Sequence, residues 1–126
     1  MRPLVIAVDG PAASGKSTLA ERIARHYGLP FLDTGLLYRA VAQILLERGA
    51  DPDDLEAAVA AAPSLQLEAI DSSRLQGEAI GDWASRVAAM AEVRAALVPL
   101  QRNFAARSRG AVLAGRDIGT VICPDA

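Results

Sequence analysis

The sequence predicts an α/β fold, in which a parallel sheet with right-handed connections is flanked by helices, because short apolar runs alternate with helical patterns. The apolar runs expected to form strands are Leu4 to Val8, Phe31 to Leu32 and Ala111 to Ala114. The first run is rich in β-branched residues and lacks polar alternation, which is typical of a buried parallel strand. Ligands bind beyond the carboxyl ends of such strands, so the segments that follow the strands are the candidate sites.

Helices are expected where apolar residues recur every three or four positions. The expected helices cover residues 17–27, 36–48, 52–62, 77–89 and 91–106. Asp53 or Asp54 is expected to cap the third helix, and Pro63 to end it. Pro99 is expected to kink or interrupt the fifth helix, unless it lies in the first turn of that helix. The segment Leu65 to Leu67 alternates like an edge strand.

A phosphate-binding loop is predicted directly after the first strand. Residues 10–17 match the pattern G-x-x-x-x-G-K-[ST], and Lys16 is the only lysine among 13 basic residues. Glycines allow backbone amides to converge on phosphates, and the following helix adds its positive N-terminal end. The compact ammonium of Lys16 suits phosphate oxygens, and the hydroxyl of Ser17 suits Mg²⁺. The expected phosphate-binding residues are Gly10, Pro11, Ala12, Ala13, Ser14, Gly15, Lys16, Ser17 and Thr18.

Composition limits the other classes of function. The 126 residues form at most one domain, and the net charge of −2 argues against a nucleic-acid or anionic-membrane surface. No apolar run reaches the roughly 18 residues that a membrane span needs. The one cysteine, Cys123, excludes an internal disulfide and fits a reducing compartment. We therefore expect a cytoplasmic protein.

A small-molecule kinase also needs a site for the group that accepts the phosphate. The candidates are Thr34, Arg39, Ser85, Arg94, Arg116 and Asp117. Arginines hold phosphate in fixed bidentate geometry, so several of them suit a phosphorylated acceptor. Two alternatives remain open from the residues alone: Arg94 as a solvated side chain on a helix, and Arg116 with Asp117 as a local ion pair. Asp9 is interpreted as a structural hydrogen-bonding residue outside the site.

Several segments together resemble bacterial cytidylate kinases. They are IAVDGP-x-x-SGKST, LDTGLLYR, WASRVAAMAEVRAAL, QRNFA and GRDIGTVICPDA, and the similarity covers the whole chain. Adenylate kinases share the Thr-Gly-…-Arg pattern but lack the segment from Ser85 to Arg94, and shikimate kinases would carry Asp-x-Asp in place of Asp33-Thr34-Gly35. The resemblance implies a P-loop nucleoside monophosphate kinase-like sheet, truncated after the third strand.

The resemblance also implies roles for individual residues. Arg39 and Arg116 would hold the phosphate of CMP, with Thr34, Tyr38 and Gly115 in the same pocket. The cytosine edge would be read by Ser85, Arg94 and Asp117. Lys16 and Arg116 would act in catalysis, with ATP and Mg²⁺ as cofactors and Ser17 as the metal ligand. CMP and dCMP are the implied substrates, and members of full length are expected to be monomeric.

Three departures from the family pattern stand out. At the position of Ala114 the family often has an acidic residue, which supports the metal through water. Residues 64–80 are short for the family's monophosphate-binding insertion. The family continues beyond position 126 into a lid with arginines, so we expect an incomplete kinase domain that is inactive alone. It would comprise 1–48 with the P-loop and the start of the CMP site, about 49–90 as the shortened insertion, and 91–126 with a helix, the third strand and the Gly-Arg-Asp segment.

The sequence as a whole is interpreted as part of an enzyme that transfers phosphate from ATP to CMP. Two alternatives remain: a P-loop kinase for another small acceptor, and a nucleotide-binding fragment without turnover.

Overall fold

The computed structural model describes residues 4–10, 15–67, 70, 75, 77–106, 110–115, 118–124 and 126. In chain order the elements are β1 (Leu4–Asp9), α1 (Lys16–Tyr27), β2 (Phe31–Asp33), α2 (Gly35–Glu47), α3 (Leu55–Ala61), η1 (Ala62–Ser64), α4 (Glu78–Ala89), α5 (Ala91–Ala105), β3 (Gly110–Gly115) and η4 (Ile118–Ile122). The chain divides into two compact units, residues 1–34 with 99–126 and residues 35–98.

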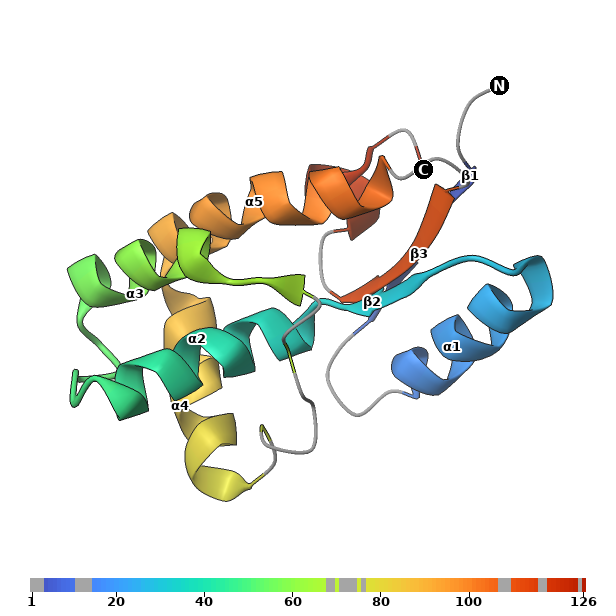
Figure 1. Ribbon diagram of the computed structural model, residues 1–126. Coiled ribbons are helices and arrows are strands. Elements are labelled where there is room, and N and C mark those ends of the chain that lie inside the picture. Colours follow the sequence, from blue (N-terminus) through green and yellow to red (C-terminus); the bar gives the residue numbers. More distant parts are fainter. Residues whose placement is uncertain are drawn as a thin grey trace. The chain divides into compact units, whose positions relative to one another are not determined.

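The first unit contains a three-stranded parallel sheet in the order β1-β3-β2 (Figure 1). The central strand β3 is buried at every position, whereas β1 is half-buried along its middle and exposed at both ends. In register, Asp9 of β1 lies opposite Gly115, and Asp33 of β2 lies opposite Ala114. The prediction of three parallel strands is confirmed. Each strand is one or two residues longer than the apolar run that predicted it.

Helix α1 packs on the sheet through small side chains. Ala20 and Ala24 are buried against Val112 and Ala114 of β3. Alanine has no side chain beyond Cβ, so the helix lies close to the strands. Since α1 begins after the carboxyl end of β1, its N-terminal turn lies at the edge where parallel sheets bind ligands.

The second unit consists of helices. Helix α2 contacts both α3 and α4. It buries Leu37, Val41 and Leu45, which recur at the helical spacing that predicted it. Of the two predicted caps for α3, the structure uses Asp54, whose Oδ1 accepts a hydrogen bond from the backbone amide of Ala57 at 3.1 Å.

One local prediction is wrong, and another is wrong in part. Leu65 to Leu67 forms no strand, because the described residues offer it no partner strand, and Leu65 is instead buried in the helical unit. Helix α5 is continuous through Pro99, so the predicted interruption is absent, whereas the kink stays a prediction. The proline removes one backbone donor, and the burial of Val93, Leu97 and Phe104 along the same helix offsets that loss.

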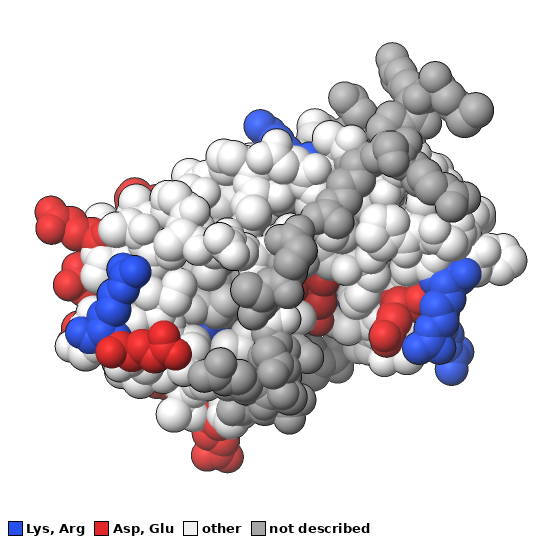
Figure 2. Space-filling view, viewed as in Figure 1, with Lys and Arg blue, Asp and Glu red and all other residues white. Residues whose placement is uncertain are grey.

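Charged side chains on the face drawn in Figure 2 occur as small groups, some of mixed sign, with uncharged surface between them. Within the described segments, no helix has both the length and the apolar character that crossing a membrane requires.

Candidate functional site

The two ends of the predicted phosphate-binding loop are held by different means. The amide of Gly10 donates to the carbonyl of Gly115 at 3.1 Å, which ties the end of β1 to the end of β3. Gly15 begins α1 in a left-handed conformation, with φ of 81°. Glycine adopts this conformation without the steric cost that other residues meet. The intervening residues Pro11, Ala12, Ala13 and Ser14 lie outside the described residues.

Lys16 turns its ammonium group back toward the loop. Its Nζ donates a hydrogen bond to the carbonyl of Gly10 at 2.7 Å, so the lysine connects the end of the loop to its beginning. The side chain is half-buried in the first turn of α1. A cation in this place adds to the positive end of the helix, and the two together attract a phosphate group.

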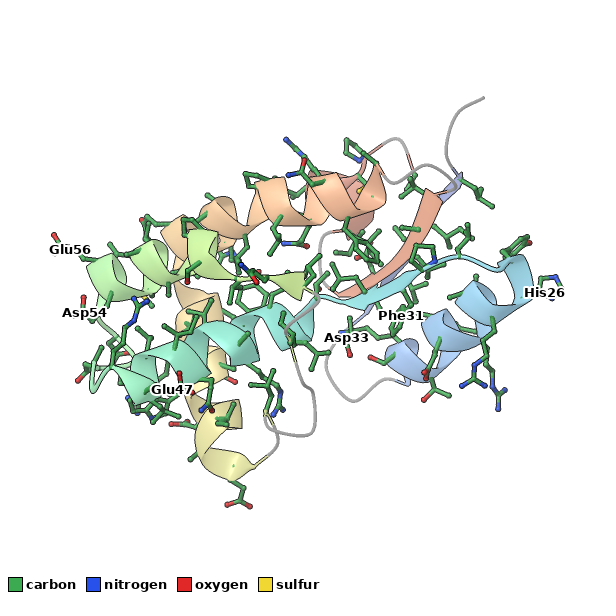
Figure 3. All side chains as sticks on the ribbon, viewed as in Figure 1. His26, Phe31, Asp33, Glu47, Asp54 and Glu56 are labelled. Carbon is green, nitrogen blue, oxygen red and sulfur yellow. The ribbon has the colours of Figure 1, made fainter. Side chains whose placement is uncertain are left out.

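Ser17 and Asp33 form a hydrogen-bonded pair. The hydroxyl of Ser17 donates to Oδ2 of Asp33 at 2.9 Å, and both side chains are half-buried. Figure 3 shows Asp33 at the end of β2, close to the first turn of α1. Hydroxyl and carboxylate oxygens are the hard ligands that Mg²⁺ prefers. No group of three or more metal-ligating side chains occurs within the described part of the chain.

Thr34 fastens β2 to β3. Its backbone amide and its Oγ1 both donate to the carbonyl of Ala114, each at 2.9 Å, and its side chain is 4% exposed. Gly115 lies against Thr34, since a Cβ at position 115 would collide with Oγ1 of Thr34. The hydroxyl proton of Thr34 is therefore already engaged within the sheet.

Asp9 holds the segment that follows the Gly-Arg-Asp motif. Its Oδ1 accepts from the amide of Ile118 at 2.7 Å and its Oδ2 from the amide of Gly119 at 2.9 Å. These two amides belong to the first turn of η4. The motif residues Arg116 and Asp117 lie outside the described residues, but the backbone on both sides of them is anchored, at Gly115 and at Ile118.

The other candidates for the acceptor site belong to the second unit. Nη1 of Arg39 donates to the carbonyl of Leu75 at 2.9 Å, and a Cβ at Gly81 would lie 3.6 Å from Nη2 of the same arginine. The hydroxyl of Ser85 donates to the carbonyl of Gly81 at 3.1 Å. The structure thus brings Arg39 and Ser85 to the same turn of α4.

Arg94 reaches α4 from the next helix along the chain. Its Nη1 donates to the carbonyl of Ala88 at 2.7 Å, one turn after Ser85. This contact caps the end of α4, where a positive charge is favourable. Tyr38 is half-buried on α2.

Asp33 was not among the site residues predicted from the sequence. Of Asp33-Thr34-Gly35, which follows the second predicted apolar run, only Thr34 was a candidate. The signal was an aspartate at the carboxyl end of a parallel strand, and Asp9 carries the same signal. The contacts that distinguish the two aspartates depend on the fold.

The parallel sheet, the glycine-bounded loop after β1 and the lysine at the start of α1 define a P-loop protein with the fold of the nucleoside monophosphate kinases. The model of the cytidylate kinase family matches residues 6–126, and the chain belongs to this family. The resemblance inferred from the sequence is confirmed.

Three bacterial relatives illustrate the similarity. The chain is 62% identical over 123 residues to a cytidylate kinase of Methylocella silvestris, a match that covers 98% of this chain and 57% of the relative. A cytidylate kinase of Methylobacterium sp. is 62% identical over 123 residues, covering 98% and 59%. One of Brucella suis is 60% identical over 124 residues, covering 98% and 57%. The chain thus spans less than three fifths of the length of these relatives.

Proposed function

We propose that the chain takes part in the transfer of the γ-phosphoryl group of ATP to CMP and dCMP, which forms CDP and dCDP. The observation that carries the proposal is the placement of Lys16, whose ammonium lies 2.7 Å from the carbonyl that opens the phosphate-binding loop. Membership of the cytidylate kinase family supports the choice of acceptor.

The first unit would bind the triphosphate. Backbone amides of the loop from Gly10 to Gly15 and the N-terminal end of α1 would surround the β- and γ-phosphates. On binding, the ammonium of Lys16 would exchange the Gly10 carbonyl for phosphate oxygens. This exchange replaces a neutral acceptor by a charged one and therefore favours the bound state.

The residues at the start of α1 fit a magnesium ion. Ser17 offers a hydroxyl oxygen, and a carboxylate lies 2.9 Å away on Asp33. Mg²⁺ typically keeps several waters and takes one or two protein oxygens along with substrate phosphates, so a small donor set is sufficient. When bound, the ion would neutralise charge on the phosphate oxygens.

The acceptor half of the proposal rests on the family resemblance. Arg39 and Arg116 would hold the phosphate of CMP, while Ser85, Arg94 and Asp117 would read the edge of cytosine. Thr34, Tyr38 and Gly115 would line the pocket. The contacts of Arg39 and Ser85 at one turn of α4 support this assignment, because both side chains lie near Gly81 in the same unit.

The chemistry of the proposed transfer demands little of the protein beyond positioning and charge. An oxygen of the CMP phosphate forms a bond to the γ-phosphorus, and the bond between that phosphorus and the β–γ bridging oxygen breaks. The products are CDP and ADP. Such transfers depend on alignment and on stabilisation of spread negative charge rather than on a strong base. Lys16 and Arg116 would supply that stabilisation.

A second candidate function is nucleotide binding by these 126 residues without turnover. One observation favours it: the chain spans 57% of the length of the relatives from Methylocella silvestris and Brucella suis. Side chains that neutralise the negative charge of the transition state in a longer protein would then not take part in an assay of these 126 residues.

One set of measurements separates the candidates. The 126-residue chain is assayed for ATP binding by calorimetry, and for ADP and CDP formation with ATP, Mg²⁺ and each of CMP, dCMP, UMP, AMP, GMP and shikimate. CDP formation that requires CMP supports transfer. Binding of ATP without ADP formation supports the second candidate. No detectable binding of ATP contradicts both.

A further inference from the structure

The carboxyl edge of the sheet carries two described aspartates, and they have different tasks. Asp9 at the end of β1 accepts hydrogen bonds from the amides of Ile118 and Gly119. Asp33 at the end of β2 instead accepts one from the hydroxyl of Ser17. The end of the central strand, Ala114 and Gly115, has no carboxylate. Of the residues that end the three strands, Asp33 is therefore the one whose carboxylate contacts the helix of the phosphate-binding loop.

The direction of the Ser17–Asp33 hydrogen bond has a consequence for metal binding. A hydroxyl that ligates a cation must point a lone pair at the ion and its proton elsewhere. Oδ2 of Asp33 accepts the hydrogen bond, with 2.9 Å between the two oxygens, so the lone pairs of Ser17 are turned away from β2. The negative charge of the carboxylate also makes the serine oxygen a better donor to a cation.

The position of Asp33 is set by the sheet. It pairs in register with Ala114, and the amide of the next residue, Thr34, donates to the carbonyl of Ala114 at 2.9 Å. Its backbone is thus anchored on the central strand before any ligand arrives. Because its side chain is half-buried, its charge is less screened by water than that of an exposed residue.

We propose that Asp33 is a positioning residue for Mg²⁺: it orients the Ser17 hydroxyl as a metal ligand and couples binding of the metal to binding of ATP. The inference rests on the proposed function, since it needs a nucleotide at the loop. Asp33 on β2 would thus supply the acidic support of the metal, and Ala114 on the neighbouring strand β3 would not.

The test compares the affinity of the 126-residue chain for the β,γ-imido analogue of ATP with Mg²⁺ and with EDTA. Asp33→Asn keeps the shape of the side chain and removes its charge. We expect this variant to reduce the gain in affinity from Mg²⁺ by about 10-fold or more, the usual effect of removing a partner of a metal ligand. Its affinity in EDTA should be unchanged or higher, because a negative charge near the phosphates is gone.

Two further variants complete the experiment. Glu21→Gln removes the same charge from an exposed residue of α1, which pairs only with Arg25 at 3.9 Å among the contacts described, and should keep the full gain. Ser17→Ala should lose the gain, and the double variant with Asp33→Asn should lose no more than the larger single loss. Circular dichroism establishes that each variant is folded.

A measurement on the unchanged chain covers the case in which Asp33→Asn does not fold. Mn²⁺ added with the ATP analogue should broaden the carboxyl ¹³C resonance of Asp33, and an unaffected resonance would overturn the inference. A full Mg²⁺ gain in folded Asp33→Asn also overturns it while the proposed function stands, as does an equal loss of affinity with Mg²⁺ and with EDTA. If the unchanged chain binds no nucleotide in either condition, the proposed function itself fails.

Discussion

The carboxylate of Asp9 and the amide of Ile118 are joined by a 2.7 Å hydrogen bond across 109 positions of sequence. Through this bond and its partner to Gly119, the strand that leads into the phosphate-binding loop also holds the first turn of η4. We expect Asp9→Ala to lower the free energy of unfolding by about 1–2 kcal/mol, because two charge-assisted hydrogen bonds at an exposed strand end are lost. Urea unfolding measures the change, and a stability equal to that of Glu21→Gln would contradict it.

Lys16→Ala should weaken ATP binding while leaving the fold intact. The lysine contacts the Gly10 carbonyl and is only half-buried, so its removal leaves no buried charge without a partner. The loss of one charge-assisted contact to phosphate corresponds to about 10- to 100-fold in affinity. In a longer protein that is active, turnover should fall by several orders of magnitude. Wild-type affinity in a folded variant would contradict the assignment of the loop.

Gly110→Ala should destabilise the protein more than Gly28→Ala does. Both glycines have positive φ, 108° and 65°, but only at Gly110 would a Cβ strike the backbone of Leu4. The conformational cost alone is about 1–2 kcal/mol for the left-handed conformation of Gly28. The collision with β1 adds to it at Gly110, and we expect a total above about 2 kcal/mol. Chemical denaturation of the two variants side by side is the measurement. Equal losses in the free energy of unfolding would contradict the prediction, because β1 would then have moved to accommodate the added Cβ.

Arg94→Ala should reduce binding of CMP more than binding of UMP, if Arg94 reads cytosine as the resemblance implies. A polar site discriminates because its own groups stay unpaired with the wrong base. We expect a loss of about 10-fold for CMP. Arg86→Ala is the matched control, since Arg86 is also exposed and pairs with Asp53 and Asp82 at 3.4 Å and 3.5 Å. An equal loss for both nucleotides would mean that Arg94 only caps α4.

Burial raises the pKa of the Cys123 thiol above its ordinary value, and the nearby charge of Arg102 opposes this rise. The folded state therefore favours the protonated thiol. The contribution of the buried thiol to stability is complete below the pKa that the thiol has in the unfolded chain. It is lost as pH rises through the pKa that the thiol has in the folded chain. Stability should fall in this alkaline range, and Cys123→Ser should reduce the fall. Alkylation by iodoacetamide should begin at higher pH in the folded chain than in urea, and the reverse order would contradict the prediction.

Several features of this protein follow from its sequence alone. The three strands and the helices from α1 to α5 were predicted because their apolar residues repeat with local periods, which neighbouring side chains satisfy without knowledge of the rest of the chain. The glycine that precedes α1 was also predictable, because the left-handed conformation of Gly15 depends on local backbone geometry. The strand predicted at Leu65 to Leu67 does not form, because a local alternating pattern becomes a strand only where a partner strand exists.

The tertiary structure alone decided how the carboxylates at the strand ends are used. Asp9 and Asp33 follow similar apolar runs, yet one binds backbone amides of η4 and the other binds the hydroxyl of Ser17. Their tasks diverge because β3, far along the chain, lies between β1 and β2 and determines which side chains meet at the edge of the sheet. Short-range patterns specify elements, whereas contacts between distant segments depend on the pairing of strands, and those contacts make the candidate site.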